Sequence, residues 1–347
     1  MPDEGAPHTE AELEERLSRP SAAAVAALGR CPGDVVVLGA GGKMGPSLAR
    51  MLRRAADSAD GGSGHRRVVA VSRFTDASAA RALESCGVEI VRADLAEPDD
   101  VRRLPDAPNV FFLAGQKFGT SGDPGGTWAM NVVVPSLCAD RYRGARIVAF
   151  STGNVYGRTP SDSGGATEVS PPEPVGEYAW SCVGRERVFG WHAARHGTRV
   201  SVIRLNYAVD LRYGVVVDVA GKVMRGEPVD VAMGYVNVIW QGDANAAAIA
   251  ALPLAASPPW TVNVTGVETT SIRSVALRLG TLLGRAAAIS SIEAPDALLS
   301  NAGRMRESLG VPSVHEAMLV EWVAAWLRAG GRTLAKPTHF EARDGRF

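Results

Sequence analysis

Short apolar runs alternate with amphipathic segments along the chain as far as residue 206. The run at 34–38 is β-branched and apolar, which predicts a fully buried strand, and the segment at 46–56 has the period of an amphipathic helix. The same alternation predicts strands at 67–71, 88–92, 109–113, 145–150 and 199–204, and helices at 77–85, 98–104, 128–142 and 178–196. Strands that alternate with helices indicate a parallel sheet with helices on both faces.

Six strands at this spacing predict a Rossmann-type α/β fold, the doubly wound parallel sheet that binds dinucleotides. After residue 206 the alternation breaks. Helices are predicted there at 215–225, 244–251, 271–283, 304–309 and 313–328, and extended segments at 236–240 and 261–264. We expect three parts: an N-terminal helical extension at 1–30, a Rossmann domain at 31–206, and a smaller substrate-binding lobe with a C-terminal tail at 207–347. Ligands of open α/β sheets bind at the carboxyl ends of the strands, so the site is expected between the two lobes.

The composition of the chain limits the classes of partner that it is expected to bind. The chain of 347 residues has no formal net charge, which argues against nucleic acid and against a membrane surface. No apolar run reaches the roughly 18 residues of a membrane span, and the acidic N-terminus lacks a signal-peptide pattern, so a cytoplasmic location is expected. The four cysteines are scattered, without the spacing of a zinc site or a disulfide framework. Lysine is scarce, with only Lys43, Lys117, Lys222 and Lys336.

A glycine loop follows the first predicted strand and opens the first predicted helix of the alternating region. Its sequence is Gly39-Ala40-Gly41-Gly42-Lys43-Met44-Gly45. Glycines permit a tight turn and let backbone amides approach a pyrophosphate, and the helix N-terminus adds unpaired N–H groups with a partial positive charge. In this context the loop predicts a dinucleotide site.

The G-x-x-G-x-x-G spacing, with the motifs that follow it, resembles the extended short-chain dehydrogenase/reductase superfamily, in particular the NAD-dependent epimerase/dehydratase family of nucleotide-sugar enzymes. The resemblance covers roughly residues 34–265, with weaker similarity to about 325. It implies a structural role for Asn131 at the start of a helix. The residues that it implies for cofactor binding are Gly39, Gly42, Lys43, Met44, Gly45, Ser72, Arg73, Asp94, Leu95, Leu113, Ala114, Gly115 and Tyr178.

The end of the second strand bears on the choice of dinucleotide. An acidic residue there would accept the ribose hydroxyls of NAD, but this chain has Ser72 followed by Arg73. An arginine can meet a 2′-phosphate or stack on adenine. The sequence therefore favours NADP over NAD, with a solvated surface arginine as the alternative.

The catalytic motifs of the family are present with one departure. Ser151 and Thr152 follow the fifth strand, where the family has a hydroxyl that binds the substrate oxygen, and the resemblance gives that role to Thr152. Tyr178 opens the next long helix, where the family has its proton-transferring tyrosine. The lysine expected four residues later, which holds the ribose and lowers the tyrosine pKa, is replaced by Cys182. Without that lysine a tyrosine titrates near ~10 and is a poor base.

Three explanations of the missing lysine remain open. Another lysine replaces it, and Lys117 is the best candidate because it follows the fourth strand. Alternatively Cys182 takes a chemical role itself, or the protein binds the cofactor and has lost the usual chemistry. The first explanation makes Thr152, Tyr178 and Lys117 the catalytic residues.

On the substrate side, Ser151, Thr152 and Asn206 are the predicted contacts, and Arg212 and Arg225 are candidates to hold a phosphate or carboxylate. The usual histidine of a later family motif is replaced by Asn237 or Val238. The sequence leaves open whether the segment at 336–340 folds over the site or contacts another subunit. His192 and His196 have a metal-compatible spacing, but no glutamate general base accompanies them. They are interpreted as surface residues, and no metal is predicted.

The predicted function is an NAD(P)-dependent oxidoreductase or epimerase that acts on a sugar, a nucleotide sugar or a related polyol by hydride transfer. The alternative is a catalytically impaired dinucleotide-binding sensor that partners another protein. The resemblance also implies a homodimer formed by the helices at 128–142 and 178–196.

Overall fold

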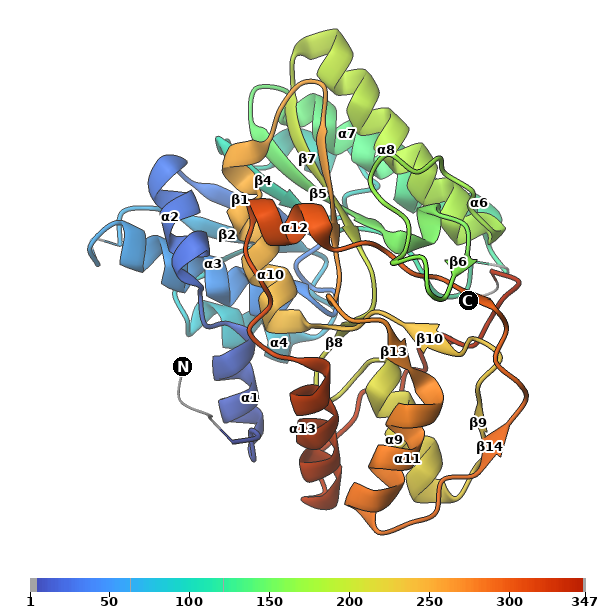
Figure 1. Cartoon of the computed structure of the whole chain (residues 1–347). Helices are drawn as coiled ribbons and strands as arrows, with labels where there is room; N and C mark the ends of the chain where they lie inside the picture. Colours follow the sequence, from blue (N-terminus) through green and yellow to red (C-terminus); the bar gives the residue numbers. More distant parts are fainter. Residues whose placement is uncertain (1–4, 63, 121, 346–347) are drawn as a thin grey trace.

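A seven-stranded parallel sheet forms the centre of the computed structural model, which describes residues 5–62, 64–120 and 122–345 (Figure 1). The strand order is β12-β7-β5-β4-β1-β2-β3. The strands are β1 (Val35–Leu38), β2 (Val68–Ser72), β3 (Glu89–Arg92), β4 (Asn109–Phe112), β5 (Arg146–Thr152), β7 (Arg199–Leu205) and β12 (Trp260–Val264). The order and the parallel pairing confirm the predicted Rossmann-type fold.

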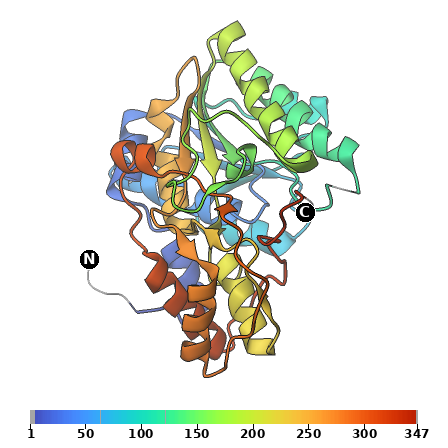
Figure 2. The ribbon, with the colours of Figure 1, turned by 45° about the vertical axis from the view of Figure 1, so that its right-hand side comes forward.

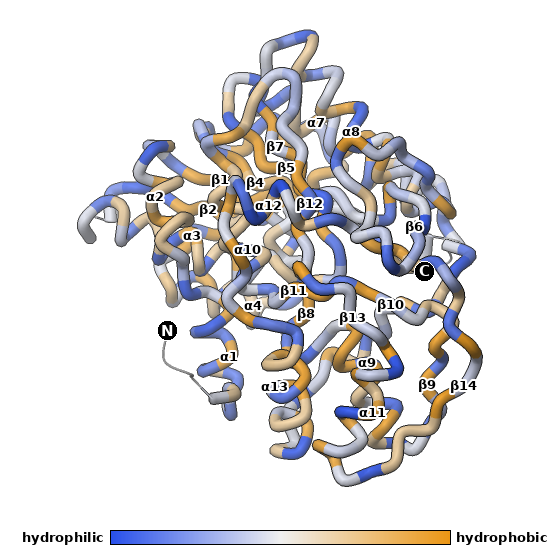
Figure 3. Tube along the Cα trace, viewed as in Figure 1, coloured by the Kyte–Doolittle hydropathy of each residue, from blue (hydrophilic) through white to orange (hydrophobic). Residues whose placement is uncertain are grey.

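Helices cover both faces of the sheet because both faces of its strands are apolar. In β1, Val35 and Val37 pack on one side, whereas Val36 and Leu38 pack on the other, as the two-residue period of a strand requires. The hydropathy colouring shows the same buried strands as a hydrophobic centre (Figure 3). One layer contains α2 (Ala22–Arg30), α3 (Gly45–Ala59) and α10 (Gln241–Ala250), and the other contains α5 (Pro98–Arg103), α7 (Val134–Arg141) and α8 (Gly176–His196).

A second hydrophobic cluster forms the smaller lobe, which lies below the sheet in Figures 1 and 2. Its helices are α9 (Val215–Arg225), α11 (Ile272–Leu283) and α13 (Glu316–Arg328). Short strand pairs lie in and beside this lobe: β8 (Ala208–Val209) with β11 (Ile239–Trp240), β10 (Tyr235–Val236) with β13 (Thr270–Ser271), β9 (Val229–Asp230) with β14 (Ile289–Ser290), and β6 (Thr159–Pro160) with β15 (Asp296–Ala297). The remaining helices include α4 (Ala77–Glu84), α6 (Pro124–Trp128) and α12 (Gly303–Ser308).

Two details differ from the sequence prediction. The strand predicted at 261–264 was expected in the smaller lobe, but as β12 it joins the main sheet as a seventh strand, with Val262 opposite Ile203 of β7. The helix expected at 128–142 is interrupted by a π-helical turn at 129–133, which places Asn131 in the interior. The division at residue 206 therefore remains a proposal, because β12 and α10 pack with the Rossmann core.

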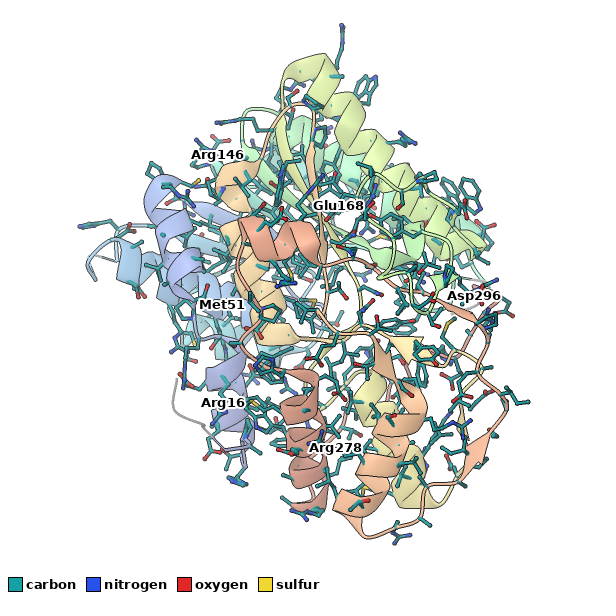
Figure 4. The ribbon with its side chains drawn as sticks, in the orientation of Figure 1. Arg16, Met51, Arg146, Glu168, Arg278 and Asp296 are labelled. Atoms are coloured by element: carbon teal, nitrogen blue, oxygen red, sulfur yellow. The ribbon has the colours of Figure 1, made fainter. Side chains whose placement is uncertain are left out.

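The two ends of the chain pack against the smaller lobe. Helix α1 (Glu10–Leu17) buries Leu13 and Leu17 in that lobe, and Arg16, labelled in Figure 4, lies over the Trp322 ring of α13 at 4.9 Å. The tail after α13 returns past α1, where the guanidinium of Arg332 pairs with Glu10. In the described part of the chain, no helix is long and apolar enough to cross a membrane.

Candidate functional site

A cleft of about 1020 Å³ opens at the carboxyl ends of the strands, between the two lobes. Loops after β1, β4, β5 and β7, the start of α8 and the C-terminal tail all line it. Its lining includes Gly41, Gly42, Lys43, Met44, Gly115, Lys117, Ser151, Thr152, Tyr178, Asn206, Arg212, Lys336 and Thr338. The tail therefore folds over the site, which is the first of the two alternatives that the sequence left open.

The glycine loop brings two strand ends into contact. Gly39 has a φ of +86°, and a Cβ atom there would lie 2.6 Å from the backbone nitrogen of Ala114. Only glycine allows this approach, so it sets the spacing of the loops after β1 and β4. At Gly42 a Cβ atom would meet one atom within 4 Å, the carbonyl oxygen of Gly39 at 3.4 Å, so this residue faces the open cleft.

The start of α3 fits an anionic group. Met44 precedes the helix and makes no side-chain capping hydrogen bond, and Pro46 occupies its first turn. The remaining backbone N–H groups of this turn point out of the helix toward the end that carries a partial positive charge. The residues present therefore fit a dinucleotide diphosphate over Gly42, Lys43 and Met44.

Two half-buried lysines line the cleft. The Lys43 Nζ atom donates a hydrogen bond of 3.1 Å to the Ala208 carbonyl and lies 4.4 Å from the centre of the Tyr213 ring. Burial lowers the pKa of Lys43 to about 8, with Asp210 opposing the shift. Burial also lowers the pKa of Lys117 to about 8. Three of the four lysines of the chain, Lys43, Lys117 and Lys336, face this one cleft.

Thr152 and Tyr178 come together as the sequence predicted. A side-chain hydrogen bond joins Thr152 and Tyr178, and the Thr152 Oγ1 atom also lies 3.1 Å from the Asn154 Oδ1 atom. Burial raises the pKa of the Tyr178 phenol well above its usual value, and the nearby Arg185 guanidinium only partly opposes this. Tyr178 is therefore a protonated hydrogen-bond donor at neutral pH.

Cys182 occupies the interior next to this tyrosine. It is fully buried, and burial raises the pKa of its thiol, while Arg185 and Lys117 oppose the shift. The charge of Lys117 and the thiol of Cys182 thus lie within electrostatic reach of each other. The charge that acts on Tyr178 itself is that of Arg185, a residue that the sequence analysis did not single out.

Arg185 and Asn131 fasten the loop after β4 to α8. Asn131 accepts a hydrogen bond from the Gln116 N–H and donates one to the Ser181 hydroxyl, both at 2.9 Å. Arg185 donates to the Asn131 Oδ1 atom at 2.5 Å and to the Phe150 carbonyl at 2.8 Å. These contacts give Asn131 the structural role that the resemblance implied, and they fix the loop that carries Lys117.

Two predicted substrate contacts differ in their surroundings. Asn206 is buried in the cleft wall, and its Nδ2 atom has no hydrogen-bond partner among the residues that the structure describes. A buried donor of this kind is costly unless a ligand satisfies it. The Ser151 hydroxyl, in contrast, donates to the Glu186 carboxylate at 2.6 Å, and the same carboxylate pairs with Arg204 at 2.7 Å. The Ser151 hydroxyl is therefore already engaged by the ion pair of Glu186 and Arg204.

That ion pair continues into a polar network behind the cleft. Arg204 donates to the Tyr156 hydroxyl at 2.6 Å, and Tyr156 donates to the Asn263 Oδ1 atom at 2.8 Å. The Glu168 carboxylate, labelled near the centre of Figure 4, accepts a hydrogen bond from the Asn263 N–H at 2.8 Å. The network ties β7 to β12 and gives Arg204 a structural role.

The residues predicted to contact adenosine lie outside the cleft lining. The side chain of Arg73 is 69% exposed, and its guanidinium lies 3.8 Å from the Asp94 carboxylate. Leu95 and Ala114 are buried, and Leu113 packs on the core behind the glycine loop. Asp76 and Ser78, which start α4, line the cleft instead; the sequence carried only their helix-cap signal.

Other candidates have structural partners. Arg212 lines the cleft but pairs with Glu14 of α1 and with Asp210, whereas Arg225 pairs with Glu227. The contribution of α1 to this wall had no signal in the sequence. Asn237, one of the two residues that could correspond to the family histidine, accepts a hydrogen bond from the Ser300 N–H and donates to the Glu268 carbonyl.

A family model described as the NAD dependent epimerase/dehydratase family matches residues 35–209. The chain belongs to this family. Membership confirms the resemblance that the motifs indicated. No protein of curated function matches the chain by sequence.

Solved structures share the fold at low sequence identity. UDP-glucose 4-epimerase from Thermotoga maritima superposes with a TM-score of 0.70 at 17% identity, over 86% of this chain and 99% of that one. UDP-glucuronic acid 4-epimerase from Bacillus cereus in complex with NAD gives 0.69 at 17% identity, over 85% and 98%. A dTDP-glucose 4,6-dehydratase from Streptomyces venezuelae with NAD bound gives 0.71 at 19% identity, over 85% and 97%.

The lowered pKa values of Lys43 and Lys117 predict how pH affects dinucleotide binding. A bound diphosphate favours the charged form of Lys43 and Lys117, whose pKa values burial lowers to about 8 in the free protein. Affinity should therefore be highest below about pH 8 and fall roughly tenfold or more between about pH 7 and pH 9 as the lysines lose their protons. Calorimetric titrations at several pH values in this range measure how steeply the affinity falls. In Lys43→Met the affinity should depend less on pH. Lys222→Met, which removes a lysine that pairs with Glu341, should show the pH dependence of the wild type.

Proposed function

We propose that this chain is an NAD(P)-dependent oxidoreductase or epimerase that acts on a sugar or nucleotide sugar. The observation that carries the proposal is the hydrogen-bonded pair of Thr152 and Tyr178 in the same cleft as the glycine loop. Asn206 supports it, because its unpartnered amide lies in the wall of that cleft. The structures that share the fold include enzymes named for UDP- and dTDP-sugars, which suggests the substrate class.

In the proposed reaction the cofactor transfers the hydride, and side chains of this protein bind the substrate oxygen and transfer the proton. When bound, the nicotinamide exchanges a hydride with a carbinol or ketone carbon of the substrate. Thr152 holds the substrate oxygen by a hydrogen bond, and Tyr178 supplies a proton to that oxygen as negative charge develops. Because burial raises the pKa of Tyr178, the phenol stays protonated at neutral pH and gives up its proton only to a strongly basic oxygen, such as a developing alkoxide. To act as a base, it needs a cation close by.

We propose that Lys117 supplies this cation. It lines the cleft with Tyr178, and its charge reaches the position of Cys182, where the family has its lysine. Desolvation in the cleft strengthens the effect of that charge on a ligand hydroxyl or on the phenol. Arg185 adds a second positive charge from behind the tyrosine.

The direct test combines binding with turnover. We expect calorimetry on the purified chain to show binding of NAD or NADP, and incubation with UDP- and dTDP-hexoses to yield an epimerised, dehydrated or oxidised sugar detectable by NMR. Binding of the dinucleotide with no conversion of any sugar, at any pH, would favour the alternative of a non-catalytic sensor. Absence of dinucleotide binding would contradict both.

The Lys117→Met variant tests the relocated cation. Turnover should fall at least ~100-fold, while dinucleotide affinity near pH 7 changes only a fewfold, because the glycine loop is untouched. Lys222→Met is the matched control and should keep full turnover. Adding Cys182→Lys to Lys117→Met should restore part of the activity. Unchanged turnover in Lys117→Met would remove this lysine from the mechanism.

For the dinucleotide, we propose that Arg73 makes NADP the preferred cofactor. Its exposed guanidinium lies 3.8 Å from Asp94, and a 2′-phosphate would replace that weak pair with a stronger contact. Arg73→Ala should weaken NADP binding about tenfold and NAD binding less than about twofold, as measured by calorimetry. Arg102→Ala, which removes another exposed arginine, is the control. Equal losses for both dinucleotides would reject the preference.

We also propose that the chain forms a homodimer through the layer of α6, α7 and α8. Trp180 and Trp191 are 53% and 57% exposed, and they lie three turns apart on one face of α8. Val133, in the π-helical turn that packs against α8, is 54% exposed. Trp180→Glu should shift the mass from dimer to monomer in light scattering. Leu277→Glu, at a residue 53% exposed on α11, should not. A wild-type chain that is monomeric at high concentration would contradict the proposal.

A further inference from the structure

A group of metal-binding side chains lies at the end of the helical layer opposite the cleft. Asp140 of α7 and His192 and His196 of α8 bring one ligand atom each to within 4.8 Å of one another. The two histidines occupy successive turns of a helix of 21 residues, and the aspartate comes from the helix packed against it. The group is therefore held by rigid elements rather than by loops.

One ring nitrogen of the buried histidine makes no hydrogen bond within the described residues. His192 is 1% exposed, so its interpretation as a surface residue is wrong. Its Nδ1 atom is buried and makes no hydrogen bond in the described structure, and its Nε2 atom lies 3.4 Å from the Ser136 hydroxyl. An unsatisfied buried nitrogen costs free energy, which a bound cation would recover. Trp191 packs edge-on against both imidazole rings and shields them from one side.

The His192 imidazole is held in its neutral form. Burial and the neighbouring His196 lower the pKa of His192, so its imidazole is neutral at neutral pH, which is the form that binds metals. The other charged groups that face it are Asp140 and Arg143. α7 ends at Arg141 and α8 ends at His196, so the partial negative charges of two helix C-termini meet here.

One competitor for the aspartate is present. The Arg143 guanidinium lies 2.6 Å from the Asp140 carboxylate, and both side chains are more than half exposed. Exposed ion pairs of this kind contribute little to stability, so a divalent ion with two imidazole ligands can displace the arginine.

We propose that Asp140, His192 and His196 form a zinc site, with water as the fourth ligand. Two imidazoles and a carboxylate are a ligand set typical of zinc, and three protein ligands leave one position open. The ion would join the C-terminal ends of α7 and α8, far from the strand ends that carry the cleft. The site is independent of the proposed reaction and needs no second copy of the chain.

The test uses the full-length chain, freed of metal with a chelator. We expect one zinc ion to bind per chain in calorimetry, and cobalt(II) in its place to give the visible spectrum of a tetrahedral site. His196→Ala and Asp140→Asn change exposed residues that leave the core intact. Each should weaken zinc binding at least ~tenfold and abolish the tetrahedral cobalt spectrum. His65→Ala, at another exposed histidine, is the matched control and should bind zinc as the wild type does.

A second variant should strengthen zinc binding instead of weakening it. Arg143→Ala removes the competitor for Asp140, so zinc affinity should rise severalfold with the cobalt spectrum retained. Zinc should also raise the Tm of the wild type but not of His196→Ala. The proposal is overturned if zinc binds wild type and His196→Ala alike, or if cobalt gives only the spectrum of the hydrated ion.

Discussion

The contact between the turn after β1 and the backbone of Ala114 is the constraint on which the cleft depends. It exists because position 39 has no Cβ atom and adopts a positive φ. The turn leaves the start of α3 uncapped by a side chain, facing the ends of β4 and β5. A larger residue at position 39 would separate the glycine loop from the loop that carries Lys117. The proposed dinucleotide site and the proposed catalytic site therefore depend on the same close approach.

The departure at Cys182 changes how positive charge reaches the surroundings of Tyr178. A small thiol fills the interior position on α8, and the positive charges come from elsewhere: Arg185, one turn further along α8, acts on Tyr178, and Lys117, on the loop after β4, acts on Cys182. The contacts of Asn131 hold both in place, because this residue joins that loop to α8. Charge on a loop that is fixed by hydrogen bonds can serve the same purpose as charge on the helix itself.

The ends of the chain complete the cleft. Helix α1 is sealed to the smaller lobe through Leu13 and Leu17, and the tail crosses from α13 to the start of α8. Arg332 pairs with Glu10 where these ends meet, and Thr338 holds the tail to Asp218 of α9. The tail also brings Lys336 to the cleft, so three of the scarce lysines converge although they are remote in sequence.

Fold class and family follow from the sequence, because local patterns dictate strand, turn and helix, and parallel strands bring their carboxyl ends together. The strand predicted at 261–264 was assigned to the smaller lobe, but it pairs with β7, and His192 was interpreted as a surface residue, but it is buried. Tertiary contacts settle these two points, together with the engagement of Ser151 by Glu186 and the entry of α1 and the tail into the cleft wall. Each depends on contacts between residues far apart in the chain, and such contacts leave no periodic signal in a single sequence.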